Sequence, residues 1–152
     1  MGANTYPDPR VSRMINEYVI PVQFNVKLDE DAPVRYHAQW TPAIIYEDAE
    51  GNEYRRSFGP LNAEQFLAEF ALAHALRYYH SGQFEKSIEL LEKALEHTKD
   101  DPLRYPENLY WIGPAKYESS GNVDELIQGF KALQRACPDN DWTKRSRQLK
   151  SD

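Results

Sequence analysis

Sulfur is nearly absent from this chain of 152 residues, which holds a single cysteine, Cys137. One cysteine cannot close an internal disulfide, and it excludes a cysteine-rich metal site. The histidines also lack metal-ligand spacing: His37, His74, His80 and His97. Because zinc usually requires three or four convergent ligands, we expect no metal and no cofactor.

Long apolar runs and an excess of positive charge are lacking too. The richest apolar stretch, residues 19–26, is interrupted by Pro21, Gln23 and Asn25, and a membrane span needs ~18 apolar residues or more. A net charge of −6 argues against a nucleic-acid surface. We therefore expect neither a membrane nor a nucleic-acid partner. One basic cluster predicts a solvated terminal helix: Lys144, Arg145, Arg147 and Lys150.

No targeting segment is recognisable, because the N-terminus does not carry a basic region followed by an apolar one. A single cysteine is compatible with a reducing compartment. We expect a cytoplasmic protein, with the compartment left open to any targeting segment that precedes Met1.

Catalytic motifs are missing as well: the chain has no serine–histidine–aspartate order, phosphate loop or glycine-rich cradle. Turns and helix caps account for the carboxylates of Asp8, Asp29, Glu30 and Asp31. Cys137 follows a predicted helix, whose C-terminal dipole raises a thiol pKa. We expect no catalytic residue in this chain.

The first part of the chain mixes helical and strand-like patterns. Asp8-Pro9 predicts a helix start, and the apolar spacing that follows predicts a helix over 9–18. Alternating apolar residues predict a strand over 19–26. One or two helical turns are expected within 31–39, and a hairpin within 43–58.

The period changes to 3.6 after Asn62, which forms a capping box with Gln65. Helices are expected over about 62–81, 84–97, 106–119 and 123–136. A polar capping helix over 140–150 would place Trp142 across the end of the stack. The chain therefore divides into an α/β part, 1–61, and a helical part, 62–152, with the helix of 62–70 shared.

Thr41-Pro42 opens an apolar strand, Ala43 to Tyr46, with a glycine-containing turn behind it. This arrangement resembles the cis-proline corner of the thioredoxin superfamily. Residues 5–70 resemble the C-terminal two-thirds of such a domain in the order and spacing of their pieces. The resemblance implies a partial thioredoxin-like fold with a cis bond before Pro42.

The family's Cys-x-x-Cys helix has no counterpart, because counting back from Thr5 runs past Met1. The strand before that helix, which lies centrally in the family's sheet, is missing too. The resemblance therefore implies a redox-inactive chain whose unpaired strands permit a homo-oligomer. We expect an internal start, through a misassigned initiator methionine or truncation. The alternative is a natural remnant that fills the gap by strand rearrangement or by pairing with another chain.

Residues 68–140 resemble two tetratricopeptide repeats, helix pairs with a period of about 34 residues. Gly113 and Pro114 predict a bend in the third helix. The positions that match in the first repeat are Ala75, Tyr78, Gly82, Phe84, Ile88, Leu91 and Ala94, and those in the second are Tyr110, Tyr117, Gly121, Ile127, Phe130 and Pro138.

Such repeats often bind peptides in a groove lined by their first helices, and the resemblance places Leu72, Leu76, Tyr79, Trp111 and Ala115 there. Without basic side chains, this groove suits an apolar or helical segment. Alternatively, the same side chains pack on the α/β part or on the final helix.

The function that the two resemblances imply is a thioredoxin-like protein-interaction module that is redox-inactive and has an unidentified protein or peptide partner. Two alternatives remain: a thiol–disulfide oxidoreductase when full length, and a cysteine-independent, chaperone-like scaffold.

Overall fold

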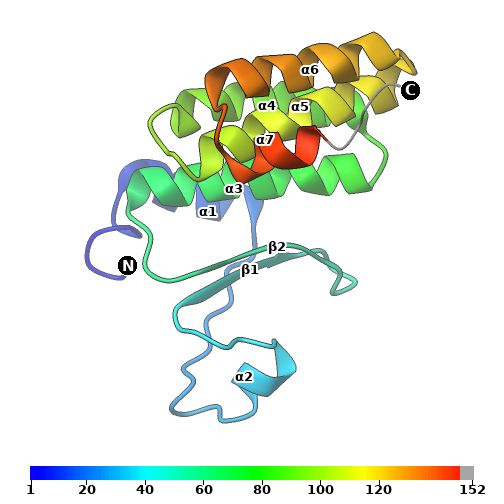
Figure 1. Cartoon of the computed structure of the whole chain (residues 1–152). Coiled ribbons are helices and arrows are strands. Elements are labelled where there is room, and N and C mark those ends of the chain that lie inside the picture. The colour runs from blue at the N-terminus through cyan, green and yellow to red at the C-terminus, as the bar shows by residue number, and fades with distance from the viewer. Residues whose placement is uncertain (148–152) are drawn as a thin grey trace. The chain divides into compact units, whose positions relative to one another are not determined.

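The computed structural model describes residues 1–147, which are mostly helical and contain one small sheet of two antiparallel strands. Contacts divide the chain into two compact units, Met1–Leu67 and Ala68–Asp152, each described here by itself. The division falls inside the stretch 62–70 that the sequence assigns to both parts. The elements, drawn in Figure 1, are α1 (Pro9–Tyr18), α2 (Ala32–Arg35), β1 (Ala43–Glu47), β2 (Glu53–Phe58), α3 (Ala63–His80), α4 (Phe84–Thr98), α5 (Arg104–Ser120), α6 (Val123–Ala136) and α7 (Asp141–Ser146).

Helix α1 begins as the sequence predicts. The Asp8 carboxylate accepts a hydrogen bond from the backbone N–H of Arg10 (2.9 Å), and Pro9 occupies the first helical position. The apolar face of α1 buries Val11 against Leu61 and Phe66, in the core of the first unit. That arrangement leaves the charged face of α1 in solvent, as expected for an amphipathic helix.

The strand predicted over residues 19–26 is not formed, which corrects the sequence analysis. The segment has no regular secondary structure, and Ile20, Val22 and Phe24 are exposed. Apolar alternation favours a strand only where a neighbour can accept and donate its backbone hydrogen bonds. In residues 1–147 the sheet contains β1 and β2 alone, so this segment has no ladder to join.

The hairpin pairs Ala43 with Phe58 at its open end and contains an irregularity between Tyr46 and Glu47. At its closed end the Asp48 carboxylate accepts hydrogen bonds from the backbone of Glu50 and Asn52, 3.0 and 2.8 Å away. These bonds fix a tight turn, and the hairpin therefore forms where the sequence predicts it.

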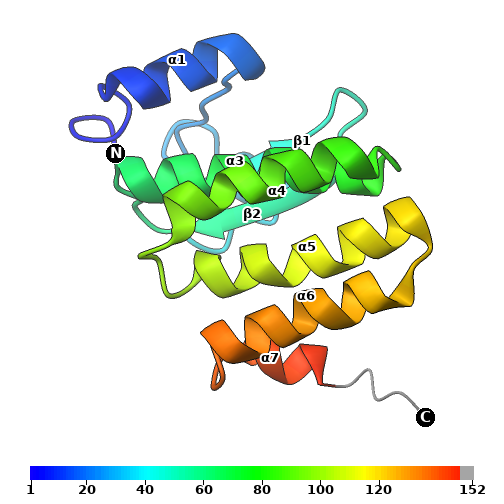
Figure 2. The same cartoon turned by 90° about the horizontal axis from the view of Figure 1, so that it is seen from above.

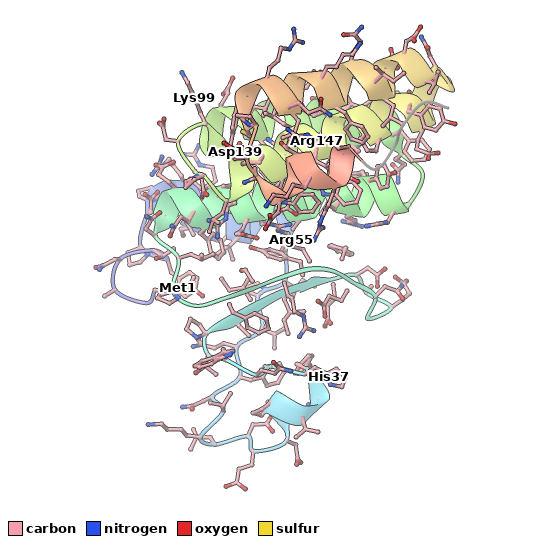
Figure 3. All side chains as sticks on the ribbon, in the orientation of Figure 1. Met1, His37, Arg55, Lys99, Asp139 and Arg147 are labelled. Carbon is pink, nitrogen blue, oxygen red and sulfur yellow. The ribbon has the colours of Figure 1, made fainter. Side chains whose placement is uncertain are left out.

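Arg56 of β2 links the hairpin to the segment after α2. Its guanidinium pairs with Glu53 and donates from Nη1 to the carbonyl of His37 (3.0 Å). His37, labelled in Figure 3, has a positive φ of 49°. The peptide bond between Thr41 and Pro42 is cis, as the sequence predicts, and the Pro42 carbonyl accepts a hydrogen bond from Gly59 N–H at 2.8 Å.

The predicted capping box opens α3. The side chains of Asn62 and Gln65 accept hydrogen bonds from each other's backbone N–H groups, at 2.9 and 3.1 Å. The helices α4 and α6 agree with their predicted ranges to within one residue. Helix α5 starts two residues earlier than predicted, because the Asp101 carboxylate accepts from the backbone N–H groups of Leu103 and Arg104.

Helix α5 lies at the centre of the second unit. It packs against α4 and α6, and Figure 2 shows it lying between them. Helix α7 contacts both α5 and α6. The core here is formed by Leu72, Ala75, Leu91 and Ala115, and the Ser87 hydroxyl donates to the Ala75 carbonyl (2.9 Å). Pro114 lies inside α5, which continues past it to Ser120.

Candidate functional site

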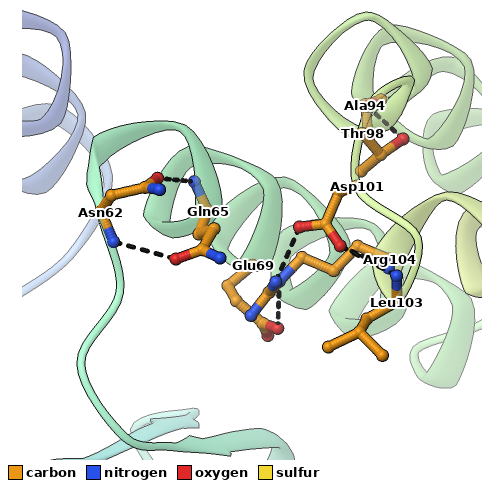
Figure 4. A network of polar contacts seen from close by, with 8 residues as sticks. All are labelled: Asn62, Gln65, Glu69, Ala94, Thr98, Asp101, Leu103 and Arg104. Atoms are coloured by element: carbon orange, nitrogen blue, oxygen red, sulfur yellow. Dashed lines mark hydrogen bonds and ion pairs between the residues drawn. The ribbon is translucent and has the colours of Figure 1, made fainter.

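A buried charge network joins α3 to the start of α5 (Figure 4). The Arg104 guanidinium donates from Nε to Glu69 Oε1 (2.6 Å) and from Nη1 to Asp101 Oδ2 (2.7 Å). All three side chains are largely buried. Burial raises the pKa of Asp101, but hydrogen bonds from the Arg104 side chain and backbone outweigh that effect and lower it. The network holds the two helices together, and the lowered pKa keeps Asp101 ionised, which suits anchoring rather than acid–base chemistry.

A second buried polar contact joins α5 to the end of α4. The Asn108 amide donates from Nδ2 to the Thr98 hydroxyl (3.3 Å), and that hydroxyl donates to the Ala94 carbonyl (3.0 Å). Asn108 is fully buried, and its Oδ1 has no hydrogen-bond partner within residues 1–147. Arg104 and Asn108 are one turn apart on α5, so both polar contacts fix the same end of this helix.

The residues predicted to line the groove differ in how deeply they are buried. Leu72 and Ala115 are fully buried in the core of the second unit, and Leu76 is nearly so. Tyr79 of α3 and Trp111 of α5 are half-buried, and their rings meet edge to face with centroids 5.2 Å apart. Any contact with a partner at this position must therefore be made by the aromatic pair rather than by the leucines.

Helix α7 packs beside Trp111, one member of the aromatic pair. The Trp142 ring lies 4.9 Å from Tyr110 and 6.5 Å from Trp111, and Tyr110 stacks on Phe130 at 5.2 Å. The Arg145 guanidinium carbon lies 4.5 Å from the ring centroid of Trp142. Trp142 thus packs across the end of the helices, as the sequence predicts. Trp111 contacts the final helix, as expected if the predicted groove residues pack within the chain.

The polar atoms of the aromatic pair have distinct roles. Burial, with smaller effects from Glu118 and Tyr110, raises the pKa of Tyr79, so its phenol stays protonated. The Trp111 Nε1–H is buried and has no acceptor in the described part of the chain. The site therefore offers apolar area and hydrogen-bond donors, and such a combination can hold a peptide but cannot transfer protons between an acid and a base.

The proline corner belongs to the first unit and is open to solvent. Thr41 and Pro42 are exposed, and the neighbouring Trp40 is 73% exposed. The one cysteine belongs to the other unit: Cys137 ends α6, where burial raises the pKa of its thiol. A raised pKa for this thiol was also predicted from the sequence, from the dipole of the preceding helix. The Cys137 carbonyl accepts a hydrogen bond from Thr143 Oγ1 at 2.6 Å.

Within residues 1–147, no group of three or more histidine, cysteine, aspartate or glutamate side chains could hold a metal ion. None of the described helices is both long enough and apolar enough to cross a membrane. Helix α7 forms Asp141–Ser146 of the helix predicted over 140–150, and residues 148–150, with Lys150 of the basic cluster, lie outside the described residues.

Four residues that anchor α5 were not predicted from the sequence: Glu69, Asp101, Arg104 and Asn108. A signal was present for Glu69, a charged residue within the apolar run of α3. Its partner is 35 positions away, and sequence periodicity does not indicate pairs at that distance.

Comparisons of this chain with protein-family models, with curated proteins and with solved structures find no match.

Proposed function

We propose that this chain is a protein-interaction module, in which two tetratricopeptide-like helix pairs, α3 with α4 and α5 with α6, follow a partial thioredoxin-like part. The partner is an apolar or helical peptide segment that meets the first helices of the two pairs. The observation that carries this proposal is the half-buried pair of Tyr79 and Trp111, which come from those two helices and touch each other.

Two features of this pair support binding of a peptide. Aromatic side chains supply large contact area at low entropic cost and are enriched in the centres of interfaces. The unpaired Trp111 Nε1–H can also gain an acceptor from a partner, which removes the cost of leaving a buried donor unsatisfied. Because this N–H is buried, a partner would reach it only after side chains around Trp111, such as Trp142, had moved.

The test is selection from a displayed library of random peptides of about 16 residues, long enough for four helical turns, on the full chain. We expect selected peptides to carry apolar residues at helical spacing. Their affinity should fall at least ~10-fold, or about 1.4 kcal/mol, in Trp111→Ala and Tyr79→Ala. Leu103→Ala is the matched control, because Leu103 is an exposed apolar residue just before α5.

Trp111→Phe keeps the ring and removes the Nε1–H, so it separates the apolar contribution from the hydrogen bond. Circular dichroism shows whether each variant keeps its helices. Peptides that bind all four variants as they bind the wild type would place the binding surface elsewhere and defeat the proposal.

A further inference from the structure

The segment between α1 and α2 presents apolar side chains to solvent. The side chains of Ile20, Val22 and Phe24 are 91, 69 and 40% exposed. Alternation of this kind is typical of a strand with one buried face. The Phe24 ring also lies 5.0 Å from Tyr36, so one end of this apolar face is already partly covered.

The backbone of the same segment is unpaired. Within residues 1–147, no hydrogen bond joins the N–H or C=O groups of residues 20–24 to another part of the chain. A row of free backbone groups beside exposed apolar side chains is a template for pairing with another strand. Pro21 keeps its own φ, and that of Ile20, near extended values, which reduces the entropy lost on pairing.

We propose that a second copy of this chain covers the segment, through antiparallel pairing of residues 19–25 about a two-fold axis at Val22. In this register Val22 faces Val22 of the second copy, Ile20 faces Phe24, and Pro21 faces Gln23. The apolar residues of both copies then share one face of the ribbon. A symmetric interface of this kind requires a self-complementary sequence, and this segment satisfies the requirement.

Pro21 fits this register. Pairs alternate between hydrogen-bonded and non-hydrogen-bonded positions in an antiparallel ladder. With Val22 and the Ile20–Phe24 pairs in the bonded positions, about six backbone hydrogen bonds form. Residue 21 then occupies a position whose backbone N–H would point away from the second copy, so the lack of an N–H in Pro21 costs no bond between the copies. A shift by one residue would place Ile20 opposite Asn25 and divide the apolar residues between both faces.

The pairing is weak, because seven residues a copy bury less area than a stable interface needs. The charge of −6 on each copy adds repulsion, which salt screens. We therefore expect association at high protein concentration and its strengthening as salt is added. This inference does not depend on the proposed function, because the segment belongs to the first unit and the aromatic pair to the second.

The test is sedimentation equilibrium of the full chain at increasing concentration in about 0.15 M salt. The wild-type mass should rise from 17.7 kDa towards twice that value. Val22→Lys and Val22→Glu should each remain monomeric, because each variant places like charges opposite one another. An equimolar mixture of the two should associate again, since the lysine of one chain then faces the glutamate of the other.

Gln23→Lys and Gln23→Glu are the matched controls. They change the net charge equally but face Pro21 on the other side of the ribbon, and both should associate as the wild type does. A wild-type chain that stays monomeric at every concentration overturns the proposal. So does undiminished association of the Val22 variants, or a mixture that fails to associate.

Discussion

Two glycines set how closely α5 and α6 approach each other. A Cβ atom on Gly129 would lie 2.6 Å from the Cα of Gly113, and a Cβ on Gly113 would lie 3.3 Å from the Leu126 carbonyl oxygen. The backbones themselves are in contact here, so neither neighbour can yield by rotating a side chain. A small residue at both positions is therefore a requirement of packing.

Gly129→Ala should destabilise the protein by about 1–3 kcal/mol through overpacking, even though alanine favours a helix by about 1 kcal/mol. Urea unfolding followed by circular dichroism measures the change. Gln128→Ala, on the exposed side of α6, serves as the control and should differ little from the wild type. Equal midpoints for the two variants would contradict the close packing of α5 on α6.

The repeat resemblance singled out Gly82 and Gly121, which follow helices α3 and α5, but not this contact. Gly82 and Gly121 have φ values of 74° and 71°, a conformation that glycine adopts freely, and their position after a helical period reveals them. Gly129 stands in the middle of a helical pattern. The need for glycine at this position comes from the contact with α5, and the spacing of residues within α6 alone carries no information about that contact.

At the scale of the elements, Arg104 is a buried electrostatic connection between α3 and α5. It serves two buried carboxylates, Glu69 and Asp101. Asp101 also caps the start of α5 through backbone N–H groups. Loss of the guanidinium would therefore remove the hydrogen bonds that it donates to two buried carboxylates.

Arg104→Met should cost roughly 3–5 kcal/mol, the range found when one partner of a buried ion pair is removed. Urea unfolding at neutral pH measures it. Lys144→Ala, which breaks an exposed pair with Asp141, is the control and should change stability by less than about 1 kcal/mol. If both variants unfolded at the same urea concentration, the network would have no anchoring role.

The helices of the second unit were predictable because each carries a 3.6 period, a cap or a closing glycine within its own sequence. Residues 19–26 were wrongly predicted as a strand because their own sequence does not contain all the information that decides their structure. A strand is completed by its neighbour, and the alternation of Ile20, Val22 and Phe24 specifies a face without supplying the partner. For the candidate site, resemblance pointed to Tyr79 and Trp111, while the burial of Leu72 and Leu76 followed only from the fold.

At the scale of the whole molecule, the chain contains a single cysteine thiol. A dithiol cycle needs two cysteines that alternate between reduced and disulfide forms. Cys137 is single, and burial raises the pKa of its thiol, which lowers the fraction of reactive thiolate at neutral pH.

We therefore expect insulin reduction in the presence of dithiothreitol to proceed at the rate without protein. The turbidity of precipitating insulin measures this rate. Cys137→Ser is the matched control and should give the same trace as the wild type. Turnover by the wild type that disappears in Cys137→Ser would show that this chain is redox-active by itself.

Helix α5 touches each of the other helices of the second unit: α3 through Arg104 and Trp111, α4 and α6 along their lengths, and α7 through Trp142. In longer arrays of helical repeats, terminal members can fray while the middle stays folded. Here the middle member is the single helix α5, and the other helices lose their contacts when it unfolds. Amide protons in α3, α4 and α6 should therefore exchange with solvent at the rate at which α5 unfolds. Within the described residues of this unit, α7 alone has few enough contacts to open independently.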